Sequence, residues 1–236
     1  GIVQGPSGIG EYGGTYRLTD KGLTLGEWHM SAWATRDSDG ISWHPWVGKS
    51  WELSEDGRIY TFKLRKNMFW SDGSPFTIED VRFAWEDIHY NKEMFPIVHT
   101  EYRDAVTDNP AKFTVLDDYT WTLTYDTPVF NITELRSSAR QWCSKDVVSW
   151  HCPAAYLKQF HPKYADGDQL QAMIKQNNLE DWTQLFSQKG NVWKNPDMPC
   201  LTAWCLSVLN DTQMTVTRNH YYVFFDPEGN QLPYMD

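Results

Sequence analysis

Tryptophan is the residue whose abundance in this 236-residue chain most clearly suggests a binding role, with 13 copies. Its ring system joins a large apolar surface to one hydrogen-bond donor, so it serves both in cores and where ligands or partners are held. A core rich in large rings is one interpretation, and a cleft lined by a few rings is the other. Four tryptophans lie where a strand or helix needs a core residue, and we expect them to pack: Trp51, Trp70, Trp85 and Trp121.

The four cysteines could form disulfides or bind a metal ion. They occur as two local pairs, Cys143 with Cys152 and Cys200 with Cys205. Four cysteines allow three pairings, and the sequence does not choose among them. An even number in an acidic chain suits an oxidising compartment. Zinc is disfavoured, because the second pair is spaced more widely than a usual zinc knuckle and His151 is poorly placed to share an ion with Cys152. Disulfides are the leading interpretation, and free buried thiols are the alternative.

Catalytic patterns are missing from the sequence. The seven histidines form no HExxH or paired-ligand pattern, and no GxSxG, phosphate-binding loop, dinucleotide glycine pattern or Cys-His signature occurs. The adjacent carboxylates Glu79-Asp80 and Asp117-Asp118 fall at a predicted helix start and a predicted turn, where they have structural roles. We therefore expect a protein that is not an enzyme and needs no cofactor or metal.

The charge balance excludes several partners. The chain carries 21 Lys and Arg against 31 Asp and Glu, a net charge of −10. Nucleic acids and anionic membranes both favour basic chains, so neither is an expected partner. The length fits one domain or two unequal ones, and no apolar run approaches a membrane span. Residues 1–14 are polar and rich in glycine, which predicts an extended leader and no signal peptide.

Two hairpins and a helix are predicted in the first half of the chain. Residues 49–66 alternate between apolar and polar on both sides of an Asp-Gly turn, which predicts a hairpin. Apolar residues at helical spacing predict a helix over 78–91, with Thr77 as the N-cap and Asp80 as a weak capping-box partner. A second hairpin is predicted over 113–125.

The second half is richer in helix and then returns to strand. Before the first hairpin, residues 28–46 show no clean period and predict a long loop that includes one helical turn. Strands on both sides of a helical stretch predict an α+β fold with a mixed, mostly antiparallel sheet and packed helices. The helices are expected at 132–142, 153–160, 168–177 and 179–188, and the late strands at 213–218 and 221–225.

Two stretches resemble a known family. Residues 48–66 read GKSWELSEDGRIYTFKLRK and residues 70–81 read WSDGSPFTIEDV. They are similar to the hairpin and following helix of family 5 extracellular solute-binding proteins, the peptide and nickel receptors of ABC importers, with some members for oligosaccharides. RNHYY at 218–222 and DPEGNQLPY at 226–234 resemble the segment that ends the family's first pass through its N-terminal lobe. The matched order covers most of residues 10–236.

The resemblance implies how the chain is organised. The family folds as two lobes that close on a ligand. Residues 15–236 are therefore expected to form the N-terminal lobe of a type II, periplasmic-binding-protein-like fold, with the second lobe absent and residues 1–14 as the leader. The sequence departs from the family at His220, where proline is usual, and at Val223, where tryptophan is frequent.

The resemblance also implies where a ligand binds. Residues 12–18, YGGTYRL, are expected to start the first strand. In the family a ligand loop begins after that strand, which here places Glu27, Trp28, His29 and Trp33 as candidate contacts. Rings offer stacking area and a carboxylate can pair with an amine. The alternative is that Trp28 and Trp33 pack in the core and Glu27 is solvated. Two further tryptophans are weaker candidates: Trp142 and Trp204.

The function implied is the capture of a peptide or oligosaccharide for the permease of an ABC importer, without catalysis. The expected location is the periplasm or the outside of the cell, including the membrane surface. The alternative is a structural or accessory subunit of a larger extracellular assembly. In that case an exposed apolar face of the lobe would bind a second protein or a second copy. A ring-lined polar pocket near Trp28 would favour solute capture, and an exposed apolar rim would favour the subunit.

Overall fold

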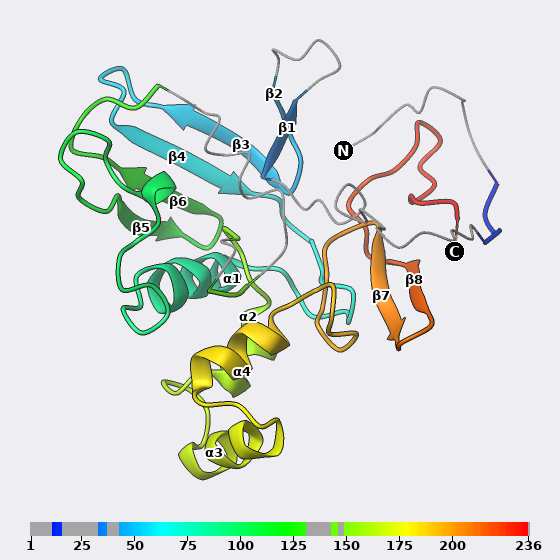
Figure 1. Ribbon diagram of the computed structural model, residues 1–236. Helices are drawn as coiled ribbons and strands as arrows, with labels where there is room; N and C mark the ends of the chain where they lie inside the picture. Colours follow the sequence, from blue (N-terminus) through cyan, green and yellow to red (C-terminus); the bar gives the residue numbers. More distant parts are fainter. Residues whose placement is uncertain (1–10, 16–32, 37–42, 131–142, 146–148, 236) are drawn as a thin grey trace.

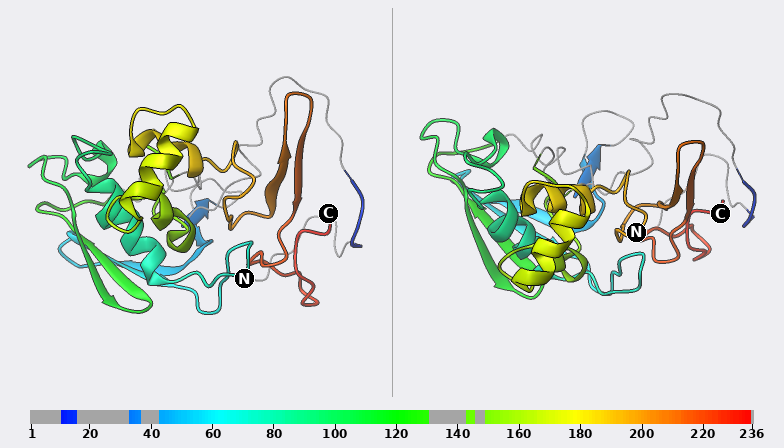
Figure 2. Two further views of the ribbon diagram at one scale, coloured as in Figure 1. Left: turned by 90° about the horizontal axis from the view of Figure 1, so that it is seen from below. Right: turned by 60° about the horizontal axis from the view of Figure 1, so that its bottom comes forward.

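The computed structural model of the chain describes residues 11–15, 33–36, 43–130, 143–145 and 149–235. Figure 1 shows a four-stranded sheet with helices beside it and, at the other end of the molecule, a separate two-stranded hairpin. In Figure 2 the helices lie on one face of the sheet. Every strand pairing among the described residues is antiparallel. The predicted α+β class is confirmed, with the strands divided among three small sheets.

Both predicted hairpins are confirmed and together form the large sheet, in the order β3–β4–β6–β5. The first consists of β3 (Gly48–Leu53) and β4 (Ile59–Leu64), and the second of β5 (Lys112–Asp117) and β6 (Thr120–Thr124). The first turn places Gly57 at a φ of 72°, which glycine adopts without a Cβ clash. The alternation along β4 buries three side chains on one face: Tyr60, Phe62 and Leu64.

The helix predicted over 78–91 is present, but it changes type along its length. α1 (Ile78–Arg82) continues directly into the π-helix η2 (Phe83–His89), and a short 3-10 turn, η3 (Thr100–Tyr102), follows. The capping box is confirmed, because the Thr77 hydroxyl accepts from Glu79 N at 3.3 Å and the Asp80 carboxylate accepts from Thr77 N at 2.7 Å. The helix buries Val81 and Trp85 in the core beneath the large sheet, and it buries Ala84 and Ile88 in the core of the helical layer.

Aromatic rings fill the space between the large sheet and this helix. Phe62 stacks on Trp121 with ring centroids 4.3 Å apart, and Trp33, Trp85 and Trp150 meet Trp121 at 5.5, 5.7 and 5.6 Å. All five side chains are at most 2% exposed. Burial of such rings is the main stabilising contribution in this part of the molecule. The packing roles predicted for Trp70, Trp85 and Trp121 are confirmed, and Trp51 packs half-buried against the same cluster.

Short helices form a second layer with its own core. α2 (Ala154–Leu157) and the 3-10 turn η5 (Lys158–Phe160) match the helix predicted over 153–160. α3 (Gly167–Gln176) and α4 (Trp182–Lys189) match the two amphipathic predictions. The helix predicted over 132–142 lies outside the described residues. The second core includes Phe83, Ile88, Leu157, Leu170, Leu185 and Phe186.

A short ladder replaces part of the loop predicted over 28–46. β1 (Ala34–Arg36) pairs with β2 (Trp43–Pro45), so the prediction is wrong for these residues. The Trp33 carbonyl accepts from Trp46 N at 3.0 Å and from Gly48 N, in β3, at 3.2 Å, and the second bond joins the ladder to the large sheet. Strands of three residues are too short to show a hydrophobic period, and backbone pairing decides them.

The separate hairpin lies at the C-terminal end of the described chain. It pairs β7 (Trp204–Leu209), which the sequence patterns did not reveal, with β8 (Met214–Arg218), which was predicted. The strand predicted over 221–225 is wrong. Its side chains do alternate between exposed and buried, but no neighbouring strand runs beside it within the described residues, and its ladder contact is a single bridge to Gln231.

The cysteines pair locally. Cys143 bonds to Cys152 in the helical layer, and Cys200 bonds to Cys205 at the base of β7, each with a Cα–Cα distance of 6.0 Å. The disulfide interpretation is confirmed, and one of the three pairings is selected. None of the helices in the described part of the chain has the length and apolar character needed to cross a membrane.

Candidate functional site

A groove of about 640 Å³ lies between the end of the large sheet and the C-terminal segment. Its walls come from residues 63–69, which span the end of β4 and the segment after it, from the turn between β5 and β6, and from the segment 221–225. The volume is within the range of small-ligand sites. Among its described lining residues none is acidic, although the chain as a whole carries a net charge of −10. The cationic lining residues are Lys49, Lys63, Arg65 and Lys66.

Arg65 is the fixed cation of this groove. Its Nε donates to the Trp46 carbonyl at 2.9 Å and its Nη2 donates to the Pro45 carbonyl at 3.3 Å. The side chain is half-buried, and burial lowers the pKa of Arg65. No carboxylate of the described chain pairs with it. A partly desolvated charge held only by neutral acceptors is costly, and an anion beside it would reduce that cost.

The three lysines of the groove differ in their partners. Lys63 pairs with Glu52 at 3.2 Å, so its charge is largely matched. Lys66 lies over the ring of Tyr119 at 4.8 Å from the centroid. The pKa of Asp117 is lowered mainly by its hydrogen bond from Tyr119 N, and the charge of Lys66 makes only a small contribution. Lys49 is exposed at the β3 end of the groove. Lys49 and Lys66 are therefore available to a ligand.

Aromatic rings form another part of the groove wall. The ring of Phe69 meets that of Tyr221 at 5.8 Å, and Tyr221 also approaches the turn at Gly73. Between 37% and 46% of each ring residue's surface stays exposed, so the rings offer faces to a ligand. The four partly exposed rings are Phe69, Tyr119, Tyr221 and Phe225.

The segment 11–15 contacts the C-terminal segment beside this groove. The Tyr12 hydroxyl donates to the Gln231 carbonyl at 2.9 Å, and Gly13 N donates to the Tyr234 carbonyl at 2.8 Å. The two tyrosine rings meet edge to face at 5.4 Å. The start of the described chain is thereby fixed against its end.

Trp204, one of the predicted ligand contacts, belongs to the same cluster. Its Nε1 donates to the Met235 carbonyl at 3.1 Å, and its β8 partner Arg218 lies over the Tyr12 ring at 4.6 Å. Trp204 is half-buried. It therefore lies close to both ends of the described chain, at Tyr12 and Met235.

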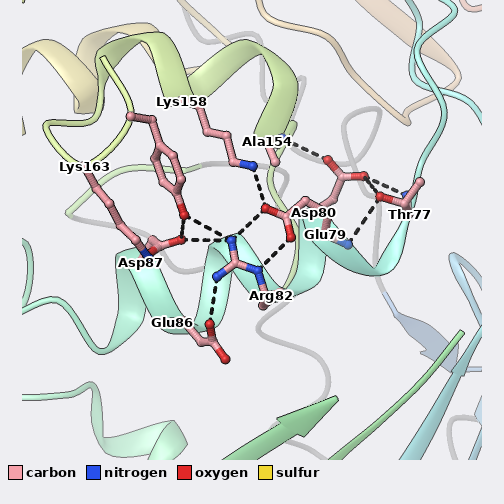
Figure 3. A network of polar contacts seen from close by, with 10 residues as sticks. Thr77, Glu79, Asp80, Arg82, Glu86, Asp87, Ala154, Lys158 and Lys163 are labelled. Carbon is pink, nitrogen blue, oxygen red and sulfur yellow. Dashed lines mark hydrogen bonds and ion pairs between the residues drawn. The ribbon is translucent and has the colours of Figure 1, made fainter. Parts of the chain in front are cut away.

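A second polar cluster, shown in Figure 3, joins α1 and η2 to the helical layer. Arg82 reaches Glu79 at 2.6 Å, Glu86 at 2.7 Å and Asp87 at 3.3 Å. Lys158 pairs with Glu79 at 2.5 Å, and a lysine of the η5–α3 connection pairs with Asp87 at 2.6 Å. Each charge in this cluster has an opposite charge beside it, so we assign the cluster to holding the layers together.

Asp80 lies at the edge of that cluster and is almost fully buried. Its carboxylate accepts from Thr77 N at 2.7 Å and from Ala154 N at 2.9 Å. Burial raises the pKa of Asp80 to about 6, against the opposing effect of these hydrogen bonds. The adjacent Glu79 is different, because its bond with Arg82 lowers its pKa to about 2.

The predicted contacts are distributed unevenly. Glu27, Trp28, His29 and Trp142 lie outside the described residues. Trp33 lies in the ring core with 0% exposure, so it presents no surface to a solute here and we assign it to packing.

The groove itself was missed by the sequence patterns. The KLRK run at 63–66 in an acidic chain was the available signal. The described residues contain no group of three or more His, Cys, Asp or Glu side chains arranged for a metal ion.

Comparison with known proteins covers nearly the whole chain. Residues 42–236 match bacterial extracellular solute-binding proteins, family 5 (middle region). The periplasmic alpha-galactoside-binding protein of Rhizobium meliloti (strain 1021) is 28% identical over 261 aligned residues, which span 98% of this chain and 33% of that protein.

Two solved structures are similar in fold. An oligopeptide-binding protein OppA has a TM-score of 0.83 and 32% identity, with 100% of this chain and 36% of that chain covered. The periplasmic binding protein MelB of Agrobacterium fabrum C58, in complex with stachyose, has a TM-score of 0.65 and 25% identity, with 97% and 34% covered. The chain thus spans about a third of the length of these relatives. The chain belongs to the family 5 bacterial extracellular solute-binding proteins.

Proposed function

We propose that the protein captures an oligosaccharide or peptide for the permease of an ABC importer and carries out no reaction on it. The observation that carries the proposal is the match along 98% of the chain to a protein named for α-galactoside binding. The relatives named above are binding proteins, and the family places the chain in the periplasm or outside the cell.

The proposed mechanism is desolvation and closure. Residues 15–236 would form one wall of a cleft, and a second lobe would close on the bound solute. Ring faces would cover apolar parts of the solute, and a few polar groups would orient it. We propose Glu27, Trp28 and His29 as contacts on this wall, with Trp204 as a further candidate. Closure then stabilises the bound state only to the extent that the solute contacts both walls.

Oligosaccharides are the class to test first. The α-galactoside relative aligns with almost the whole chain, and MelB was solved with stachyose. Peptides are the second class, because the OppA structure has the higher TM-score of the two.

Native mass spectrometry of the protein purified from its source is the decisive test. We expect a protein mass with one small additional mass, and after its removal we expect stachyose or a tripeptide to bind in titration calorimetry. A defined oligomer without a small mass, together with no heat from either solute, would contradict solute capture.

That outcome would support an accessory subunit instead. Val208 and Leu209 at the far end of β7 are 43% and 39% exposed, which is the kind of apolar surface that another chain could cover.

A further inference from the structure

We propose that the groove is an anion site of its own, which takes a small organic acid with an apolar ring face, such as a carboxylate-bearing sugar. Unlike the solute contacts proposed at Glu27 to His29, this site consists of residues that the structure describes. Its three cations without an ion-pair partner among the described residues are Lys49, Arg65 and Lys66.

The charge of the groove points to an anion. The described lining residues include four cations and no carboxylate, in a chain with ten more acidic than basic residues. Of these four cations only Lys63 has a carboxylate at ion-pair distance within the described chain, and that partner, Glu52, is not a lining residue. A ligand carboxylate could pair with Arg65 in fork geometry and with Lys49 or Lys66 as point charges.

Arg65 is pre-organised for this role. Two backbone carbonyls hold its Nε and Nη2, at 2.9 and 3.3 Å, so the guanidinium plane is fixed before a ligand arrives. Its Nη1 group has no protein acceptor within the described residues. Little side-chain freedom is therefore lost on binding, which favours affinity.

The aromatic rings of the groove indicate that the anion also has an apolar face. Tyr119 lies under Lys66, and Phe69, Tyr221 and Phe225 are partly exposed around the same groove. An inorganic anion would pair with the cations but would leave the faces of the aromatic rings exposed to water. A ring-bearing anion would cover both, in a volume that accommodates a di- or trisaccharide-sized molecule.

Titration calorimetry on the whole protein tests the proposal with three probes: trigalacturonate, neutral maltotriose and inorganic phosphate. We expect trigalacturonate to bind more tightly than either control and to weaken as salt rises. The double variant Lys49→Gln/Lys66→Gln should weaken trigalacturonate binding about tenfold. Lys175→Gln, which removes the same charge from an exposed position on α3, should change it less than about twofold.

Other results overturn the proposal. If trigalacturonate does not bind, the groove is not an anion site. If phosphate binds with equal affinity, the aromatic rings do not contribute to binding. If Lys175→Gln weakens trigalacturonate binding as much as the double lysine variant does, the anion is attracted by the overall charge and not by the groove. Tyr119→Leu keeps all charges and should weaken trigalacturonate about threefold without affecting phosphate. Stachyose or tripeptide capture should persist in the double lysine variant, which separates failure of this site from failure of solute capture.

Discussion

Arg82 and Arg65 are both partly buried, yet their surroundings are opposite. Arg82 contacts three carboxylates and the hydroxyl of Tyr164, and together they join α1 and η2 to the helical layer. Arg65 contacts two backbone carbonyls and faces a groove without acidic lining residues in the described chain. The first arrangement satisfies its charge internally, and the second leaves its charge to a ligand.

The same contrast separates the two ends of the molecule. Between sheet and helices, rings such as Trp121 and Trp85 are completely enclosed. Around the C-terminal segment, rings such as Tyr221 and Phe225 are partly exposed and lie beside cations. Enclosed rings stabilise the fold through burial, whereas exposed rings in a concave setting offer binding surface.

The largest effect is expected in the ring core. Trp121→Ala removes a fully buried ring that contacts Phe62, Trp33, Trp85 and Trp150, and should lower the free energy of unfolding by about 3–5 kcal/mol. Urea unfolding followed by far-UV circular dichroism measures it. Phe225→Ala, at a groove ring, should cost less than about 1 kcal/mol. Similar losses in both variants would remove the distinction between the two ring sets.

Asp80 should produce a pH dependence of intermediate size. Its folded pKa of about 6 lies above the unfolded value of 3.8, so the folded state binds the proton more tightly. This contribution is complete below pH 3.8 and is lost as pH rises through about 6, a change of about 3 kcal/mol. Glu79, with its pKa lowered to about 2, acts oppositely, since its contribution is present above its unfolded value of 4.5 and lost as pH falls toward 2.

Urea titrations at several pH values between 4 and 7 measure the Asp80 effect. In Asp80→Asn the decline in unfolding free energy over this interval should be smaller than in the wild type. An unchanged slope would show that Asp80 does not titrate there.

The smallest effects on stability are expected from replacing the two arginines. Arg82→Met removes one cationic partner from the Asp87 side chain, which is only 4% exposed. Because Arg82 itself is 23% exposed, solvent weakens the interaction, and the free energy of unfolding should fall by about 2 kcal/mol. Arg65→Met loses two hydrogen bonds but also a poorly compensated charge, so its cost should be below about 1 kcal/mol. The two variants make the same chemical change and serve as mutual controls. Equal costs in urea unfolding would contradict the difference that we infer.

The predictions from sequence succeeded where the pattern is local. The Asp-Gly hairpin, the Thr77 capping box and the amphipathic helices α3 and α4 each depend on residues a few positions apart. The predictions failed where a distant partner decides, as in the short ladder β1–β2 and in the segment 221–225.

The candidate site was less predictable than the fold. The surroundings of Trp204 depend on Met235 and on Tyr12, and Trp33 is enclosed by rings from β4, β6 and the segment around Trp150. Nothing in the order of these residues along the chain reveals such contacts.

The sequence by itself determined the two hairpins of the large sheet, the capped helix at 78–91, the helices α3 and α4, and the family, because alternation, capping and the two matched stretches are properties of neighbouring residues. Only the tertiary structure decided which cysteines bond, which tryptophans are enclosed, and which arginine faces carbonyls in place of carboxylates. The reason is physical. Burial and electrostatic interactions depend on distance in space, and residues such as Arg65 and Tyr221 are separated along the chain yet line one groove.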